Sequence, residues 1–164
     1  MILIADTAPI HYLILIDEIE VLRTLAGRVI VPQAVFQELQ TAGAPEQVRR
    51  WIGSQPDWFE VRQANPLLFT PRKRIGAGET EAIALAIELR ADALLIDDGD
   101  AIKEAHRLQI PVLRLFNILE NAAKKNLLDL SQAVEKVKTT NFHLPPAELI
   151  EAMLERDRQR QQAS

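Results

Sequence analysis

Two short apolar runs in this chain end in acidic residues. Ile2–Ala5 is followed by Asp6, and the apolar residues 93–96 are followed by Asp97-Asp98-Gly99-Asp100. A short apolar run closed by a polar cluster predicts a buried strand. If both strands are central and parallel, their acidic ends lie at the same edge of the sheet, where open α/β sheets bind ligands.

Strand-like segments alternate with helical segments along the chain. Strands are expected at residues 2–5, 29–31, 58–61, 93–96 and 111–113, with a loop over residues 65–78 and only helices from residue 117 onward. This alternation predicts an α/β fold with three layers, α/β/α, around a central, mainly parallel sheet of four to five strands.

The length of 164 residues predicts one domain over residues 1–150 with helices at its C-terminal end, followed by a polar helical or disordered segment at residues 151–164. The chain has no cysteine, which excludes disulfides and zinc–thiolate sites. No apolar run approaches the roughly 20 residues needed to cross a bilayer, so we expect a cytoplasmic protein without membrane contact.

Two glutamates on predicted helices can point to the edge where the aspartates lie. At about 100° per residue, Glu79 falls about 40° from Ile83, inside the apolar sector of a helix over residues 79–90. Glu38 flanks the apolar stripe of its own helix, whereas Glu81 falls on a polar face. A single acid of this kind is often only a helix cap or a partner of the helix dipole. Because four such acids can reach one point, a shared site is the better interpretation.

Carboxylates at close range need a compensating cation, because like charges oppose each other's ionisation. Oxygen ligands favour Mg²⁺ or Mn²⁺ over zinc, and the three histidines (His11, His106 and His143) show no ligand spacing. Divalent ions held by carboxylates activate water and stabilise charge on a phosphodiester, so the pattern predicts cleavage of a nucleic acid.

A nucleic-acid backbone requires a local basic surface, because the formal net charge of −4 gives no global attraction. The best candidate is the basic run Arg72-Lys73-Arg74, just before Glu79. Such a run in a loop is usually only a solvated surface.

Four stretches of the chain resemble motifs of the PIN-domain family, the metal-dependent ribonuclease fold that includes VapC-type toxins. They are Ile-Ala-Asp-Thr-Ala-Pro at 4–9, Val-Pro-Gln-Ala-Val-Phe-Gln-Glu-Leu at 31–39, Gly-Ala-Gly-Glu-Thr-Glu-Ala-Ile at 76–83 and Leu-Leu-Ile-Asp-Asp-Gly-Asp at 94–100. Their order and spacing carry the resemblance, which runs from residue 1 to about residue 126 and is closest to a less characterised, largely prokaryotic branch.

Matched by position, the resemblance implies a set of four metal-ligating and catalytic residues: Asp6, Glu38, Glu79 and Asp98. It implies supporting places for four more: Thr7, Glu81, Asp97 and Asp100. The family usually has Asp at the third acid, where Glu79 stands here with Glu81 as a competing match. Ile96 replaces a usual Thr, which leaves Asp97 as an alternative to Asp98.

The resemblance further implies a Mg²⁺- or Mn²⁺-dependent endoribonuclease, the toxin of a toxin–antitoxin pair, with RNA as substrate, a small antitoxin as partner and a homodimer as assembly. The alternative is a PIN-fold module that binds RNA or protein with weak or no cleavage. Other phosphoryl-transfer enzymes fit less well. A haloacid-dehalogenase-like phosphatase needs an acid where Ala8 stands, and a receiver domain needs a lysine where Arg114 stands.

Overall fold

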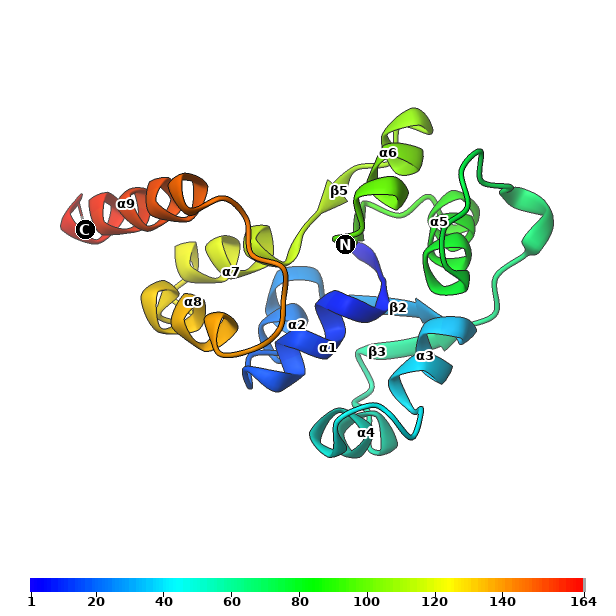
Figure 1. The fold of residues 1–164 in the computed structure, drawn as a ribbon, viewed down its shortest axis with the longest axis horizontal. Helices are drawn as coiled ribbons and strands as arrows, with labels where there is room; N and C mark the ends of the chain where they lie inside the picture. Colours follow the sequence, from blue (N-terminus) through cyan, green and yellow to red (C-terminus); the bar gives the residue numbers. More distant parts are fainter. Residues whose placement is uncertain (164) are drawn as a thin grey trace.

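The computed structural model describes residues 1–163, which form a five-stranded sheet covered by helices (Figure 1). The strand order is β3-β2-β1-β4-β5, and every neighbouring pair is parallel. The strands are β1 (Ile2–Ala5), β2 (Arg28–Pro32), β3 (Phe59–Arg62), β4 (Ala93–Leu95) and β5 (Val112–Leu113). The predicted three-layer α/β/α fold with a parallel sheet is therefore confirmed.

Helices connect the strands and make up the C-terminal part of the chain. They are α1 (Thr7–Leu15), α2 (Val21–Ala26), α3 (Gln33–Leu39), α4 (Glu46–Gly53), the 3₁₀ turn η1 (Pro66–Leu68), α5 (Ala77–Leu89), α6 (Gly99–Arg107), α7 (Leu115–Lys124), α8 (Leu130–Lys138) and α9 (Ala147–Ala163). Among residues 1–163, no helix combines the length and apolarity that crossing a membrane requires.

Successive residues of each strand enter opposite cores, because side chains alternate across a sheet. Leu3 and Ala5 of β1 pack with α1, α2, α3, α4 and the C-terminal helices, while Ile4 packs with α5 and α6. Figure 1 shows α7, α8 and α9 gathered on the side of the sheet away from α5. Burial on both faces explains why β1 and β4 are apolar throughout.

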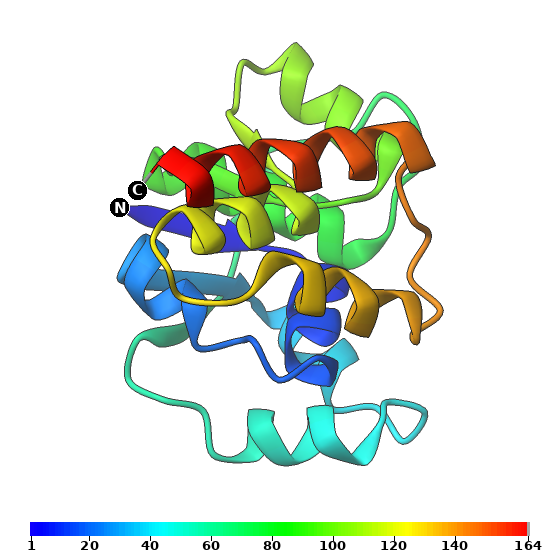
Figure 2. The ribbon, with the colours of Figure 1, turned by 90° about the vertical axis from the view of Figure 1, so that its left-hand side faces the viewer.

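The C-terminal helix is longer and better packed than its polar sequence indicates. Ile150 and Met153 belong to the core, and Arg156 forms an ion pair with Glu120 of α7. Figure 2 shows α9 lying over α7 with α8 beside them. Of the predicted segment 151–164, residues up to Ala163 are helical, and Ser164 lies outside the described residues.

One helix begins earlier than its pattern predicts. Helix α5 starts at Ala77 rather than at residue 79, since Gly76 is its N-cap and accepts hydrogen bonds from the backbone and the hydroxyl of Thr80. The predicted loop over residues 65–78 also contains η1, whose Asn65 cap accepts a hydrogen bond from the Leu67 backbone N–H.

Candidate functional site

Asp6 and Asp98 emerge at the same edge of the sheet from the adjacent strands β1 and β4. The backbone N–H of Asp6 still donates to the Leu95 carbonyl at 2.9 Å, so the pairing extends past the end of β1. Asp6 therefore points out of the carboxyl edge of the sheet, at the first turn of α1. It occupies the N-cap position of that helix but makes no side-chain capping hydrogen bond.

Glu38 reaches this edge from α3 and contacts Thr7. The Thr7 hydroxyl donates a 2.5 Å hydrogen bond to Oε2 of Glu38. The other oxygen of Glu38 and Oδ1 of Asp6 both lie against Gly78 of α5, where an added Cβ would stand 2.9 Å and 3.2 Å from them. Three elements that are far apart in sequence thus meet at one point.

Asp6 is buried, with 4% of its surface exposed, and its pKa is raised from 3.8 to about 7. Burial is the largest cause, because it removes water from the ionised carboxylate, and the charges of Glu79, Glu38 and Asp98 add to it. Across residues 1–163, no lysine, arginine or histidine lies within 4.0 Å of these four carboxylates. The group is a concentration of negative charge that the described chain leaves without a cation.

Glu79 lies in the first turn of α5 and folds back towards its cap, so that its carboxylate would collide with a side chain on Gly76. Burial raises the pKa of Glu79, and the charges of Asp98 and Glu38 raise it further. The predicted inward direction of Glu79 thus agrees with its electrostatic contact with the other acids.

The two adjacent aspartates after β4 face different partners. Asp98 caps α6, accepting a 2.9 Å hydrogen bond from the Ala101 backbone N–H, and its charge raises the pKa of both Asp6 and Glu79. Asp97 instead accepts hydrogen bonds from the Leu115 backbone N–H and from Nε of Arg114. Asp98 is therefore the one of the two that belongs to the acid cluster, which we define as Asp6, Glu38, Glu79 and Asp98.

Glu81 and Asp100, expected in supporting places, are engaged elsewhere. Oε1 of Glu81 accepts a 3.1 Å hydrogen bond from the Ala34 backbone N–H at the start of α3, which ties α5 to the helix that carries Glu38. Asp100 forms a 3.1 Å ion pair with Lys73.

The basic run lies beside α6. Glu104 of that helix accepts hydrogen bonds from the backbone N–H groups of Arg72 and Lys73 and forms an ion pair with Arg107. The backbone of the run is therefore fixed, while the side chains of Arg72 and Arg74 are exposed and form no ion pair with any described residue.

The sequence does not indicate the roles of two residues in this region. The sequence pattern shows Gly78 only as part of the motif at residues 76–83, and Arg114 only where a receiver domain needs a lysine. Gly78 is buried and makes room for Asp6 and Glu38, and the Gly-Ala-Gly-Glu spacing was the available signal for it. Nothing in the sequence marks Arg114 as the partner of Asp97.

The acid cluster has the composition of a metal centre, but its oxygens are not in a coordinating arrangement. Within residues 1–163, no three or more acidic or histidine side chains are placed to hold a metal ion as they stand. Glu38 is exposed and Glu79 half-buried, so both have space to rotate, whereas Asp6 is fixed by burial.

Comparison with known proteins agrees with the fold. A family profile described as PIN domain matches residues 2–158. The structure is similar to that of a PilT N-terminus domain protein from the hyperthermophilic archaeon Sulfolobus solfataricus. The TM-score is 0.51 at 18% sequence identity, over 88% of this chain and 100% of that one, and at this identity the likeness concerns the fold alone. No curated protein matches the chain.

The profile match covers nearly the whole chain, including all four acids of the cluster. PIN domains are generally nucleases, and those nucleases usually use divalent metal ions. By sequence profile and by fold, this chain belongs to the PIN-domain family.

Proposed function

We propose that this protein is a Mg²⁺- or Mn²⁺-dependent endoribonuclease whose centre is the acid cluster. The observation that carries the proposal is the burial of Asp6 among three other carboxylates without a cationic side chain in ion-pair contact within residues 1–163. Uncompensated charge of this kind is costly. A divalent cation would remove that cost by occupying the space between the carboxylates.

The donor set fits such an ion. All four side chains offer hard oxygen ligands, the type that Mg²⁺ and Mn²⁺ prefer. Asp6 would be the fixed ligand, and Asp98 would be held in place because it also caps α6. Glu38 and Glu79 would complete the set by rotating their side chains.

A bound divalent ion supplies an activated water and neutralises charge on the phosphodiester. The chain's own residues would supply the positioning. Thr7 holds one oxygen of Glu38 through its hydroxyl, and Glu81 holds the start of α3 against α5. The exposed side chains of Arg72 and Arg74 would contact the RNA backbone, and Lys73 would stay paired with Asp100.

We further propose that the protein is the toxin of a toxin–antitoxin pair, inhibited by a small antitoxin and assembled as a homodimer. This part of the proposal rests on the resemblance of the four motifs to VapC-type toxins. Co-expression with the product of an adjacent short reading frame, followed by mass measurement in solution, tests both partners. A monomer that binds no such product would contradict it.

The test of the nuclease proposal is cleavage of a panel of RNAs with Mn²⁺ by the wild type, Asp6→Asn and Glu88→Gln. Glu88 lies on α5 like Glu79 but is exposed and outside the cluster, so its variant is the matched control. We expect cleavage by the wild type and by Glu88→Gln, and none by Asp6→Asn. Equal cleavage by all three, or by none, would contradict the proposal.

One observation favours a second candidate function, a binding module with weak or no cleavage. The cluster is not preformed as a metal site among the described residues, so the fold could be kept as a scaffold. RNA binding that persists in Asp6→Asn, combined with no cleavage by the wild type, would support this second function.

A further inference from the structure

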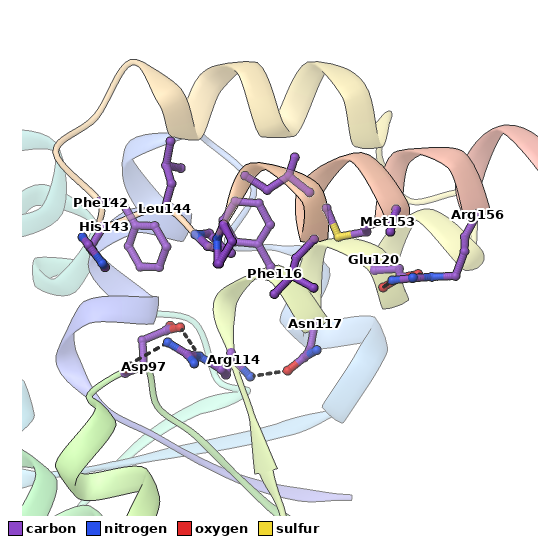
Figure 3. A pocket seen from close by; sticks show the side chains of 15 residues that line it. Asp97, Arg114, Phe116, Asn117, Glu120, Phe142, His143, Leu144, Met153 and Arg156 are labelled. Carbon is purple, nitrogen blue, oxygen red and sulfur yellow. Dashed lines mark hydrogen bonds and ion pairs between the residues drawn. The ribbon is translucent and has the colours of Figure 1, made fainter.

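A cavity of about 480 Å³ lies beyond β5 on the side of the C-terminal helices (Figure 3). It opens between the N-terminal end of α7, the segment after α8 and the first turns of α9. Its lining includes Asp97, which directly precedes Asp98 of the cluster. The volume falls within the range of roughly 300–1,000 Å³ that is usual for small-ligand sites.

Arg114 places a guanidinium at the end of this cavity that is nearest the acids. It follows β5, the neighbour of β4 in the sheet, so it lies at the edge that carries Asp98. Nε donates to Oδ1 of Asp97 and Nη2 to the Asp97 carbonyl, each at 3.2 Å, while Nη1 has no partner among residues 1–163. The side chain is 55% exposed. A guanidinium held in this way is ready to bind a phosphate oxygen, because little side-chain freedom remains to be lost.

The other arginine that lines the cavity, Arg156, is equally exposed, at 55%, but lies away from Asp97 (Figure 3). Arg156 forms two hydrogen bonds with the carboxylate of Glu120 at the opposite end of the cavity, as Figure 3 shows. Each end of the cavity thus carries an arginine paired with a carboxylate, and Arg114 is the one at the edge of the sheet that carries Asp98.

Between these ends the wall is aromatic and apolar with a few polar groups. The rings of Phe116 and Phe142 stack with centroids 6.0 Å apart, and Met153 lies beside them. Asn117 and His143 also line the cavity, and both are exposed. An aromatic wall with an amide and an imidazole at its mouth suits an unstacked base of single-stranded RNA, which stacks on apolar surfaces and hydrogen-bonds through its edges.

We propose that this cavity binds one nucleobase of the RNA substrate, and that Arg114 contacts the phosphate between that base and the acid cluster. The inference rests on the proposed ribonuclease function for its substrate class, and it adds a specificity site to it.

Binding is measured by NMR titration with the four 5′-mononucleotides, which contain no phosphodiester to cleave, and with ribose 5-phosphate, which lacks the base. Ala152→Trp fills the cavity from an exposed position of α9, and Glu151→Trp is its control on the same helix but outside the cavity lining. Arg114→Gln removes the guanidinium and leaves Asp97 its hydrogen bond from Leu115. Thermal melting of each variant checks that it is folded.

We expect at least one mononucleotide to shift the amide signals of residues 114–117 and 142–153. Ala152→Trp and Arg114→Gln should each weaken that binding roughly tenfold, and Glu151→Trp should not. Ribose 5-phosphate should bind more weakly than the best mononucleotide. The inference is overturned if no nucleotide shifts these signals, or if Ala152→Trp binds the nucleotides as tightly as the wild type does.

Sequencing the ends of RNA fragments cut from a random pool separates this inference from the proposed function. The wild type and Glu151→Trp should prefer a base at a fixed distance from the cut, and Ala152→Trp should lose the preference. Cleavage with an identical preference in all three overturns the inference and leaves the nuclease proposal standing. Absence of cleavage together with cavity-dependent nucleotide binding overturns the nuclease proposal and supports the cavity.

Discussion

Asp6 and Gly78 lie so close together that a side chain on Gly78 would crowd the Asp6 carboxylate. A Cβ on Gly78 would stand 3.2 Å from Oδ1 of Asp6 and 2.9 Å from Oε1 of Glu38. Because Asp6 is buried and cannot withdraw into solvent, the glycine decides how closely α5 approaches the strand edge. The acid cluster therefore depends on a glycine at position 78 as well as on the four carboxylates.

We predict that Gly78→Ala weakens Mn²⁺ binding by about tenfold or more, because the methyl group displaces Glu38 and presses on Asp6. Alanine favours helix by up to about 1 kcal/mol over glycine, so the fold should persist. Gly53→Ala, in α4 with open space around its Cβ position, is the control and should bind metal normally. Unchanged affinity in Gly78→Ala would show that the close approach does not matter for binding.

The tandem aspartates should separate into one structural and one functional residue. Asp97→Ala leaves the Leu115 N–H and Nε of Arg114 without their acceptors, and should cost about 1–2 kcal/mol, or roughly 2–8 °C in Tm. Asp98→Asn should keep the α6 cap, since Asn caps as well as Asp, but lose metal affinity. Melting and metal titration of both variants test this, and the reverse pattern would assign Asp97 to the cluster.

Stability of the metal-free protein should fall as the pH rises from about 4 to about 7. In that window the folded chain keeps a proton on Asp6, whose pKa is about 7, while the unfolded chain, with a pKa of 3.8, has released it. The free energy of unfolding therefore decreases with increasing pH, by about 4 kcal/mol at most. The raised pKa of Glu79 acts in the same direction.

Asp6→Asn removes this cost, so with a chelator near pH 8 its Tm should exceed that of the wild type by roughly 5–10 °C. Near pH 4 the two Tm values should converge. Melting curves across this range provide the measurement. A wild-type Tm that does not change between pH 4 and 7 would contradict the burial of an ionisable Asp6.

The basic run should contribute to RNA affinity through charge alone. Replacing Arg72 and Arg74 with alanine should weaken RNA binding several-fold and reduce the slope of log K against log salt by about 1.4, since each contact with single-stranded RNA releases about 0.7 counterions. Arg49→Ala, exposed on α4, is the control. Anisotropy titrations at several salt concentrations measure the slope, and an unchanged slope would place the RNA elsewhere.

The sequence predicted the strands and the acids at their ends because those features are local. An apolar run that ends in Asp and a glutamate that falls in an apolar sector are visible in a single segment. The parallel order of the sheet then brings the segments together without further information. Asp6 and Asp98 were therefore placed correctly at one edge.

The finer contacts were not predictable, because each joins residues that no local pattern relates. The choice of Asp98 over Asp97 for the cluster depends on Arg114, which lies 17 residues away and acts on Asp97. Glu81 appeared to compete with Glu79, but the Ala34 backbone N–H engages it. The cavity is formed by α7, α9 and the segment after α8, whose packing depends on tertiary contacts rather than on helical periodicity.

Calorimetric titration of the metal-free protein with Mn²⁺ near pH 7 tests the central claim most directly, because it needs no knowledge of the RNA target. We expect the wild type to bind the ion with release of protons, since Asp6 is partly protonated at that pH. Asp6→Asn and Glu38→Gln should each reduce the affinity at least about tenfold, and Glu88→Gln should leave it unchanged. Absence of binding by the wild type, or equal affinity in Asp6→Asn, would contradict a metal centre in the acid cluster.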